Sequence, residues 1–369
     1  MAALVLLVAG GALAWSASHY REQCTSELRQ DNFVAAIGSC RVAAQLYQPF
    51  QWIRPQAYAS ALNDQGLAEY RQHRFPESGE HLRAALALYQ RSEADGSANQ
   101  ATTLLNLGSL SGDLGDLRAQ KQWNQQSVAM FDKHGLPCAV SAVRAAANLG
   151  LVMNALRESK DAALMLARRV ERNKQCDQLN GRESALTLRV LGEAHSKNAN
   201  YGDALASLDA GILQLRQAQA EQSLEMAYTL NTRAFVLNEL NRPDEAEQDV
   251  RKALPILAGH FGGISVGEGT AHGILAAAQR RRGKPQEAER EYEEAERIYR
   301  RLLGNDHPRL AIILLYKASL LRSVGQRDKA DLALREALRI RIAAFGKDSE
   351  QVADVNKALE DGGDIRNVH

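Results

Sequence analysis

The feature that most constrains this chain is a small residue that recurs every 42 positions. Eight consecutive copies keep this register, at Cys24, Gly66, Gly108, Gly150, Gly192, Ala234, Ala276 and Ala318. A second small position follows twelve residues later in most copies, and a bulky residue such as Leu166 or Leu208 usually comes four residues after that. Small residues set against large ones at fixed offsets indicate two helices in close contact. A repeated helical hairpin is therefore the expected building block.

Turn residues and composition support the same fold class. Turn signals such as Gly115-Asp116 and Asn200-Tyr201 separate the two helices, and Pro243 falls where a second helix would begin, the position where a helix tolerates proline. Aromatic residues make up only 5% of the chain, which argues against a sandwich or barrel of aromatic strands. The 45 basic and 44 acidic side chains balance, which argues against a nucleic-acid partner. We therefore expect an all-α fold.

One copy departs from the pattern. Gln120 and Asn124 occupy positions that are small and bulky in the other copies, while Ala119 and Trp123 lie one residue earlier. This offset predicts a turn that is one residue shorter in the third hairpin.

Several short motifs resemble the tetratricopeptide repeat (TPR). They are Asn106-Leu107-Gly108, Asn148-Leu149-Gly150, Val190-Leu191-Gly192 and Tyr201-Gly-Asp-Ala204-Leu. The spacing of 42 residues and the stretch Leu303-Gly-Asn-Asp-His307-Pro308 are similar to the kinesin-light-chain-like subclass. In that stretch we expect Asp306 to cap the next helix and Pro308 to open it.

The resemblance implies a right-handed superhelical solenoid of about eight helix-turn-helix repeats over residues 17–352, with the first helix of each repeat on the concave side. A capping helix over about 349–359 is expected to complete a solenoid domain at 19–360. The polar residues 361–369 are expected to form a flexible tail.

The chain begins with an uncharged segment. Residues 2–18 contain no charged side chain, which is typical of a signal peptide or membrane anchor at residues 1–18. An uncleaved segment would attach the protein to a membrane, and we expect a periplasmic or inner-membrane-anchored, extracytoplasmic location in a bacterial-type envelope. Two alternatives are a hydrophobic first helix packed on the end of the solenoid and an internal start within a longer protein.

The four cysteines suggest two pairs. Cys24 and Cys40 occupy facing positions of the first hairpin, and Cys138 and Cys176 lie at ends of the fourth hairpin that antiparallel helices bring together. Two disulfides would fit an oxidising compartment; four buried free thiols are the alternative. The spacings contain no C-x-x-C or H-x-x-x-H cluster, so we expect no metal site.

Sequence signatures of catalysis are missing. The chain contains no G-x-x-x-x-G-K-[ST], G-x-S-x-G or H-E-x-x-H motif. His195 and His272 are expected to be packed or rim residues, and the charged stretch 287–301 a solvated helix face. We expect no catalytic residues, no cofactor and no enzymatic activity.

The resemblance also places a binding site. In the family, an asparagine two residues before the small position holds the backbone of an extended peptide, and Asn106 and Asn148 match it. Further inward-facing candidates, which give the middle of the groove a positive charge, are Arg144, Asn154, Arg189, Lys197 and Asn231. These residues favour an acidic peptide segment or protein in the concave groove. A polar inner face that merely keeps this surface hydrated is the alternative.

The function that follows is a non-catalytic scaffold or adaptor for protein–protein interaction. The alternative is an extracytoplasmic sensor or regulatory region of a membrane signalling protein linked to a kinase or transcription regulator.

Overall fold

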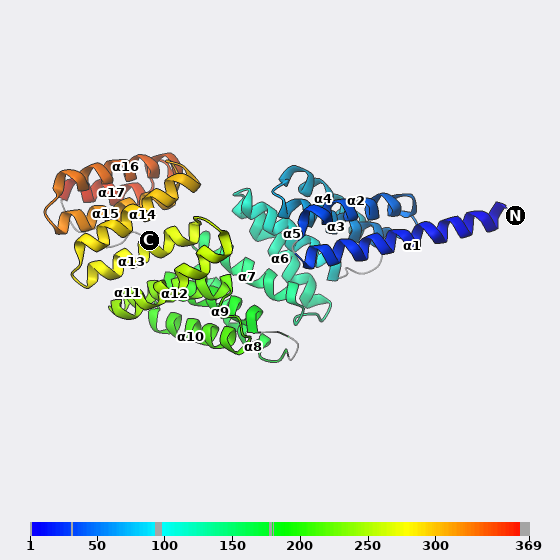
Figure 1. The fold of residues 1–369 in the computed structure, drawn as a ribbon, viewed down its shortest axis with the longest axis horizontal. Coiled ribbons are helices and arrows are strands. Elements are labelled where there is room, and N and C mark those ends of the chain that lie inside the picture. The colour runs from blue at the N-terminus through cyan, green and yellow to red at the C-terminus, as the bar shows by residue number, and fades with distance from the viewer. Residues whose placement is uncertain (1, 31, 93–97, 177–178, 180, 362–369) are drawn as a thin grey trace. The chain divides into compact units, whose positions relative to one another are not determined.

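The computed structural model describes residues 2–30, 32–92, 98–176, 179 and 181–361, with backbone only for residues 2–11, 350 and 361. These residues form seventeen α-helices and one 3-10 turn, η1 (Gln48–Phe50), and the described part contains no strand. The chain divides into two compact units, Met1–Leu179 (unit 1) and Asn180–His369 (unit 2). Figure 1 shows that the helices of each unit follow one another along the chain as packed pairs.

Unit 1 consists of four helical hairpins. They are α1 (Ala2–Arg29) with α2 (Phe33–Tyr47), α3 (Pro55–Arg71) with α4 (Phe75–Arg91), α5 (Ala98–Asp113) with α6 (Leu117–Lys133), and α7 (Val140–Ala155) with α8 (Ser159–Asn173).

Unit 2 continues the same architecture and ends on a single helix. Its hairpins are α9 (Gly181–Lys197) with α10 (Tyr201–Gln217), α11 (Leu224–Glu239) with α12 (Pro243–Phe261), α13 (Val266–Arg281) with α14 (Pro285–Leu303), and α15 (Pro308–Ser323) with α16 (Arg327–Phe345); α17 (Glu350–Asp361) packs on α16. The predicted all-α solenoid of helical hairpins is confirmed.

The recurring small residue sets the distance between the paired helices. A Cβ atom added to Gly150 would lie 2.7 Å from Leu166 Cδ1, and one added to Gly192 would lie 2.7 Å from Leu208 Cγ. The helices can approach this closely only because glycine has no side chain. In the last three hairpins of unit 2 alanines occupy the same position, and Ala234 is fully buried. The predicted contact of small against large residues is confirmed.

The prediction of a shortened turn in the third hairpin is wrong. The connection from Asp113 to Leu117 is as long as the connection from Arg71 to Phe75 in the second hairpin. Asn124 takes the bulky position itself: it is fully buried, and its Oδ1 would lie 2.8 Å from a Cβ on Gly108. Its Nδ2 donates to the carbonyl of Gln120 at 2.9 Å. Asparagine has nearly the shape of leucine, and the helix backbone provides an acceptor for its Nδ2, so the register is kept.

The turn inside each hairpin repeats the same backbone conformation. A residue with positive φ recurs every 42 positions, at His73, Gly115, Arg157, Ala199, Asn241, Gly283 and Gly325. The next residue donates its N–H back across the end of the first helix, as in the bond from Lys284 N to Gln279 O at 3.0 Å. This is the Schellman arrangement, which ends a helix on a left-handed residue. A non-glycine residue in this conformation costs about 1–2 kcal/mol.

The first helices of the hairpins, which we call the A helices, differ in their contacts from the second, or B, helices. Consecutive A helices contact one another directly within each unit: α1, α3, α5 and α7 in unit 1, and α9, α11, α13 and α15 in unit 2. Over the described residues, consecutive B helices do not approach each other in this way. Within each unit the A helices therefore lie on the inner side of the stack.

The start of α15 differs in detail from the expectation. Pro308 opens the helix as predicted, but the N-cap is His307, whose Nδ1 accepts the N–H of Arg309 at 3.1 Å. Asp306 binds the guanidinium of Arg339 at 2.5 Å instead. The carboxylate is therefore used between neighbouring hairpins and not as the cap.

The N-terminal segment forms part of α1, which begins at Ala2. Within the described part of the chain, no helix combines the length and the apolar character that crossing a bilayer requires. The side chains of residues 2–11 lie outside the described part, and so does the expected tail at 362–369. The signal peptide or anchor at residues 1–18 therefore stays a prediction.

Candidate functional site

An accessible stripe runs along α7 on the inner side of unit 1. Val140, Arg144 and Ala155 are exposed and Asn148 and Leu151 are half-buried; these five residues, here called the α7 stripe, recur at helical spacing on one face. The opposite face of α7 is buried in the core of unit 1. The stripe offers a guanidinium, an amide and apolar groups to a ligand.

Two other predicted residues of unit 1 lie in the core. Asn106 on α5 is only 9% exposed, and its Nδ2 donates to Asn63 Oδ1 of α3 at 3.0 Å. Asn154 on α7 is also buried. The neighbouring A helix covers Asn106, which the sequence of a single repeat does not indicate. The structure therefore brings Arg144 and Asn148 to one surface and separates Asn106 and Asn154 from it.

Arg189, predicted to supply positive charge in the groove, is already paired. On α9 its Nε lies 2.6 Å from Glu225 Oε1 of α11, Glu193 lies 3.8 Å away, and the guanidinium lies 6.0 Å from the centre of the Tyr228 ring. Burial alone would lower the pKa of Arg189, but the two carboxylates outweigh this effect and raise it. Glu193 and Glu225 thus neutralise the positive charge that the sequence suggested.

The remaining two predicted residues of unit 2 differ in exposure. Asn231 on α11 is buried, and its Nδ2 donates to the carbonyl of Gly267 on α13 at 3.3 Å. Lys197, in the last turn of α9, is exposed. Of these two, only Lys197 is accessible to a partner.

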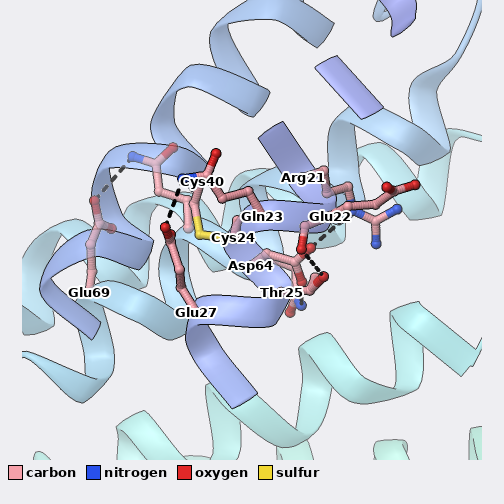
Figure 2. Close-up of a disulfide and its surroundings, with 11 residues drawn as sticks. Arg21, Glu22, Gln23, Cys24, Thr25, Glu27, Cys40, Asp64 and Glu69 are labelled. Atoms are coloured by element: carbon pink, nitrogen blue, oxygen red, sulfur yellow. Dashed lines mark hydrogen bonds and ion pairs between the residues drawn. A yellow bond between two sulfur atoms is a disulfide. The ribbon is translucent and has the colours of Figure 1, made fainter. Parts of the chain in front are cut away.

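Polar side chains connect consecutive A helices in unit 1. Arg21 of α1 binds Asp64 of α3 at 3.0 Å, and the hydroxyl of Tyr70 donates to Asp113 of α5 at 2.7 Å. Burial raises the pKa of Asp64, and Arg21 partly opposes that shift. Figure 2 shows Arg21 and Asp64 side by side near the first disulfide. These bonds link neighbouring A helices. We therefore assign the four side chains to the stability of the fold and not to ligand binding.

Two disulfides lock hairpins of unit 1. Cys24 of α1 and Cys40 of α2 are buried and joined with an S–S distance of 2.06 Å (Figure 2). Cys138 and Cys176 join the two ends of the α7–α8 hairpin, with a Cα–Cα distance of 5.4 Å. No described cysteine is left as a free thiol. The second disulfide closes the hairpin that carries the α7 stripe.

Histidines take part in polar contacts with carboxylates. His272 Nδ1 lies 2.6 Å from Glu291 Oε2, and His81 Nδ1 lies 2.7 Å from Glu69 Oε2. The bond to Glu69 raises the pKa of His81, although burial opposes the shift. In the part of the chain that the structure describes, no three His, Cys, Asp or Glu side chains gather in a way that could hold a metal ion.

A polar cavity of about 350 Å³ lies beside this His81–Glu69 pair, between α2, α3 and α4. Its lining includes Arg41, Tyr58 and Arg74. The guanidinium of Arg74 is bound to Glu77 at 2.8 Å. The cavity is therefore lined by groups that largely bind one another.

Comparison with known proteins agrees with the repeat pattern. The tetratricopeptide repeat family matches residues 58–133 and 268–343, so it matches part of each unit. No curated protein matches the sequence significantly.

Solved structures with a similar fold include the following three. The structure of a Rap protein complexed with Competence and Sporulation Factor has a TM-score of 0.61 and 11% identity, over 90% of this chain and 87% of that one. The apo form of the quorum sensor NprR from B. thuringiensis has a TM-score of 0.53 and 13% identity, over 94% of this chain and 99% of the other. BtubC (BKLC) from P. vanneervenii has a TM-score of 0.50 and 17% identity, over 62% and 92%. The family match and the hairpin repeats show that this chain contains tetratricopeptide repeats, at residues 58–133 and 268–343.

Proposed function

We propose that this protein is a non-catalytic scaffold that binds a peptide segment or partner protein along the A-helix face of unit 1. The observation that carries the proposal is the α7 stripe, in which Arg144 and Asn148 lie accessible between the apolar residues Val140 and Leu151. A side-chain amide can donate to and accept from a peptide backbone at once. A guanidinium suits a carboxylate.

We further propose that the bound segment is acidic and that its carboxylate meets Arg144. Arg189 is less suited to this role because its side chain is only 12% exposed, whereas Arg144 is exposed.

An extracytoplasmic location is part of the same proposal. It is supported by the uncharged residues 2–18 and by the arrangement of all four cysteines in two disulfides. Cell fractionation with and without added protease, combined with thiol mapping, tests it. A protease-protected protein with four free thiols would overturn this location.

A second candidate is the sensor or regulatory region of a membrane signalling protein. The similarity in fold to the quorum sensor NprR and to a Rap protein in complex with its factor supports this candidate. Partners crosslinked in native membranes distinguish the two functions, since a kinase or transcription regulator would favour the sensor and envelope assembly proteins would favour the scaffold.

Charge reversal on the stripe tests the binding site. The double substitution Arg144→Glu/Asn148→Ala should lower partner recovery in a crosslinked pull-down at least about tenfold, as expected when a charge-assisted contact becomes repulsive. Lys160→Glu is the matched control, because Lys160 is an exposed cation on the B helix α8 of the same hairpin. Equal recovery with both variants would refute the placement of the site on the α7 stripe.

A further inference from the structure

Two consecutive large apolar side chains between the first two hairpins are almost fully exposed. Trp52 is 86% exposed and Ile53 is 80% exposed, in the segment that follows η1 and precedes α3. Covering a side chain of this size is favourable by about 1.5–3 kcal/mol. Two adjacent large apolar side chains that are both exposed to solvent therefore indicate a surface that contacts a membrane or another molecule.

The segment begins where the end of α2 packs against α1. Tyr47, the last residue of α2, packs in the same core cluster as Ala17 of α1 and Ala44 of α2. The segment after Tyr47 therefore emerges at the level of Ala17. Figure 1 shows that the N-terminal part of α1 projects beyond this end of α2.

Further apolar side chains lie on α1 at the same end. Trp15 is 72% exposed and Leu13 is 43% exposed. In the sequence, the uncharged run 2–18 continues from here toward the N-terminus. Arg54, which is exposed, follows Ile53 and adds one positive charge at the base of the segment.

We propose that Trp52 and Ile53, together with Trp15, insert into the interfacial layer of a lipid bilayer and hold the end of the first hairpin on the membrane. Tryptophan is enriched at the depth of lipid headgroups, because its ring is apolar and its N–H is polar. Arg54 is placed to meet anionic headgroups. The inference rests on the proposed membrane attachment through residues 1–18 and adds a second, independent point of contact.

Tryptophan fluorescence tests the inference directly, because the chain has three tryptophans. Full-length variants that keep only Trp15, Trp52 or Trp123, with phenylalanine at the other two positions, are mixed with phosphatidylcholine–phosphatidylglycerol vesicles. The vesicles contain lipids brominated at either a shallow or a deep acyl carbon. Trp52 should be quenched at least about twofold more by the shallow bromines than by the deep ones, as expected at the interface. Trp123, a half-buried residue of α6, should not be quenched.

The outcomes separate this inference from membrane attachment itself. Quenching of Trp15 without quenching of Trp52 would overturn the contact by the loop and leave attachment intact. Quenching of neither would overturn both. A blue shift of Trp52 that grows with protein concentration in the absence of vesicles would assign the surface to a second copy of the chain and overturn the proposal.

A matched pair of variants gives a second readout. Trp52→Ser/Ile53→Ser should lower the bound fraction at limiting lipid at least about tenfold, given the free energy of burying two large apolar side chains. Val34→Ser removes a side chain that is 74% exposed at the start of α2, the other end of the same hairpin, and should leave binding unchanged. Equal losses in the two variants would contradict a contact localised at Trp52 and Ile53.

Discussion

Leu166 lies directly over Gly150, so that a Cβ on the glycine would come within 2.7 Å of the leucine Cδ1. Leu166 is fully buried, and protein interiors are closely packed. The fourth hairpin is therefore built around the absence of a side chain at one position. The sixth hairpin solves the same problem with a different pair, Ala234 and Val250.

Enlarging Gly150 should destabilise unit 1. Gly150→Val should lower the free energy of unfolding by about 2–3 kcal/mol, because overpacking forces Leu166 and the helix backbone apart. The double variant Gly150→Ala/Leu166→Val, which copies the pair of the sixth hairpin, should recover most of the loss relative to Gly150→Ala alone. Urea denaturation followed by circular dichroism measures both effects. Gly38→Ala is the control, because a Cβ there meets nothing within 4 Å.

The left-handed turn residues predict a stabilising substitution. Ala199 has a φ of 59°, a conformation that glycine adopts without cost. Ala199→Gly should raise the free energy of unfolding by about 1 kcal/mol, and Gly283→Ala, at the equivalent position of another hairpin, should lower it by about the same amount. Denaturant titrations measure the two changes. Shifts of the same sign in both variants would contradict the conformational explanation.

The two disulfides should contribute unequally to stability. The Cys24–Cys40 bond has a sequence separation of 16 and the Cys138–Cys176 bond one of 38. Loop entropy predicts a loss of about 3 kcal/mol for Cys24→Ser/Cys40→Ser and about 4 kcal/mol for Cys138→Ser/Cys176→Ser. Denaturation of the variants under oxidising conditions measures the difference, and the wild type with added reductant should lose both contributions. Insensitivity to reductant would argue that the bonds do not form in solution.

Stability should depend on pH through His81. Its pKa is raised in the folded state by the hydrogen bond to Glu69, so the stabilising charged form is fully present below the pKa of the unfolded chain. The contribution is lost as pH rises through the higher pKa of the folded state. His81→Ala should therefore cost about 1 kcal/mol more at pH 5.5 than at pH 9. Glu69→Gln should remove most of this pH dependence, and a cost that grows with pH would contradict the assignment.

The repeat pattern could be predicted from the sequence because nearly every hairpin sets a small residue against a large one at the same two positions. It failed at Asn124, where a polar residue with nearly the shape of leucine fills the position and bonds to its own helix. The polar character of Asn124 suggested a shift of register, but its side-chain volume, which is close to that of leucine, lets it fill the position. The division of the chain into two units after Leu179 could not be predicted from the sequence, because the period of 42 residues continues unchanged across it.

The candidate site was predictable in part. Helical periodicity identifies the A helices but does not tell which inner positions a neighbouring A helix covers, and Asn106 is covered in this way by α3. The neutralisation of Arg189 also depends on Glu225, 36 residues away on the next A helix. Contacts between adjacent repeats follow from the tilt of the helices, which a one-repeat pattern does not contain.

In the described part of each unit, consecutive A helices contact one another directly and consecutive B helices do not, and this difference has a mechanical consequence. Neighbouring hairpins of a unit are held together directly by their A helices and not by their B helices. Small changes in the angle between neighbouring hairpins therefore disturb few packed atoms on the side of the B helices. Bending is therefore the softest deformation of each unit. A ligand that contacts two or more A helices at once would link neighbouring hairpins, and it would make the unit more rigid when it binds.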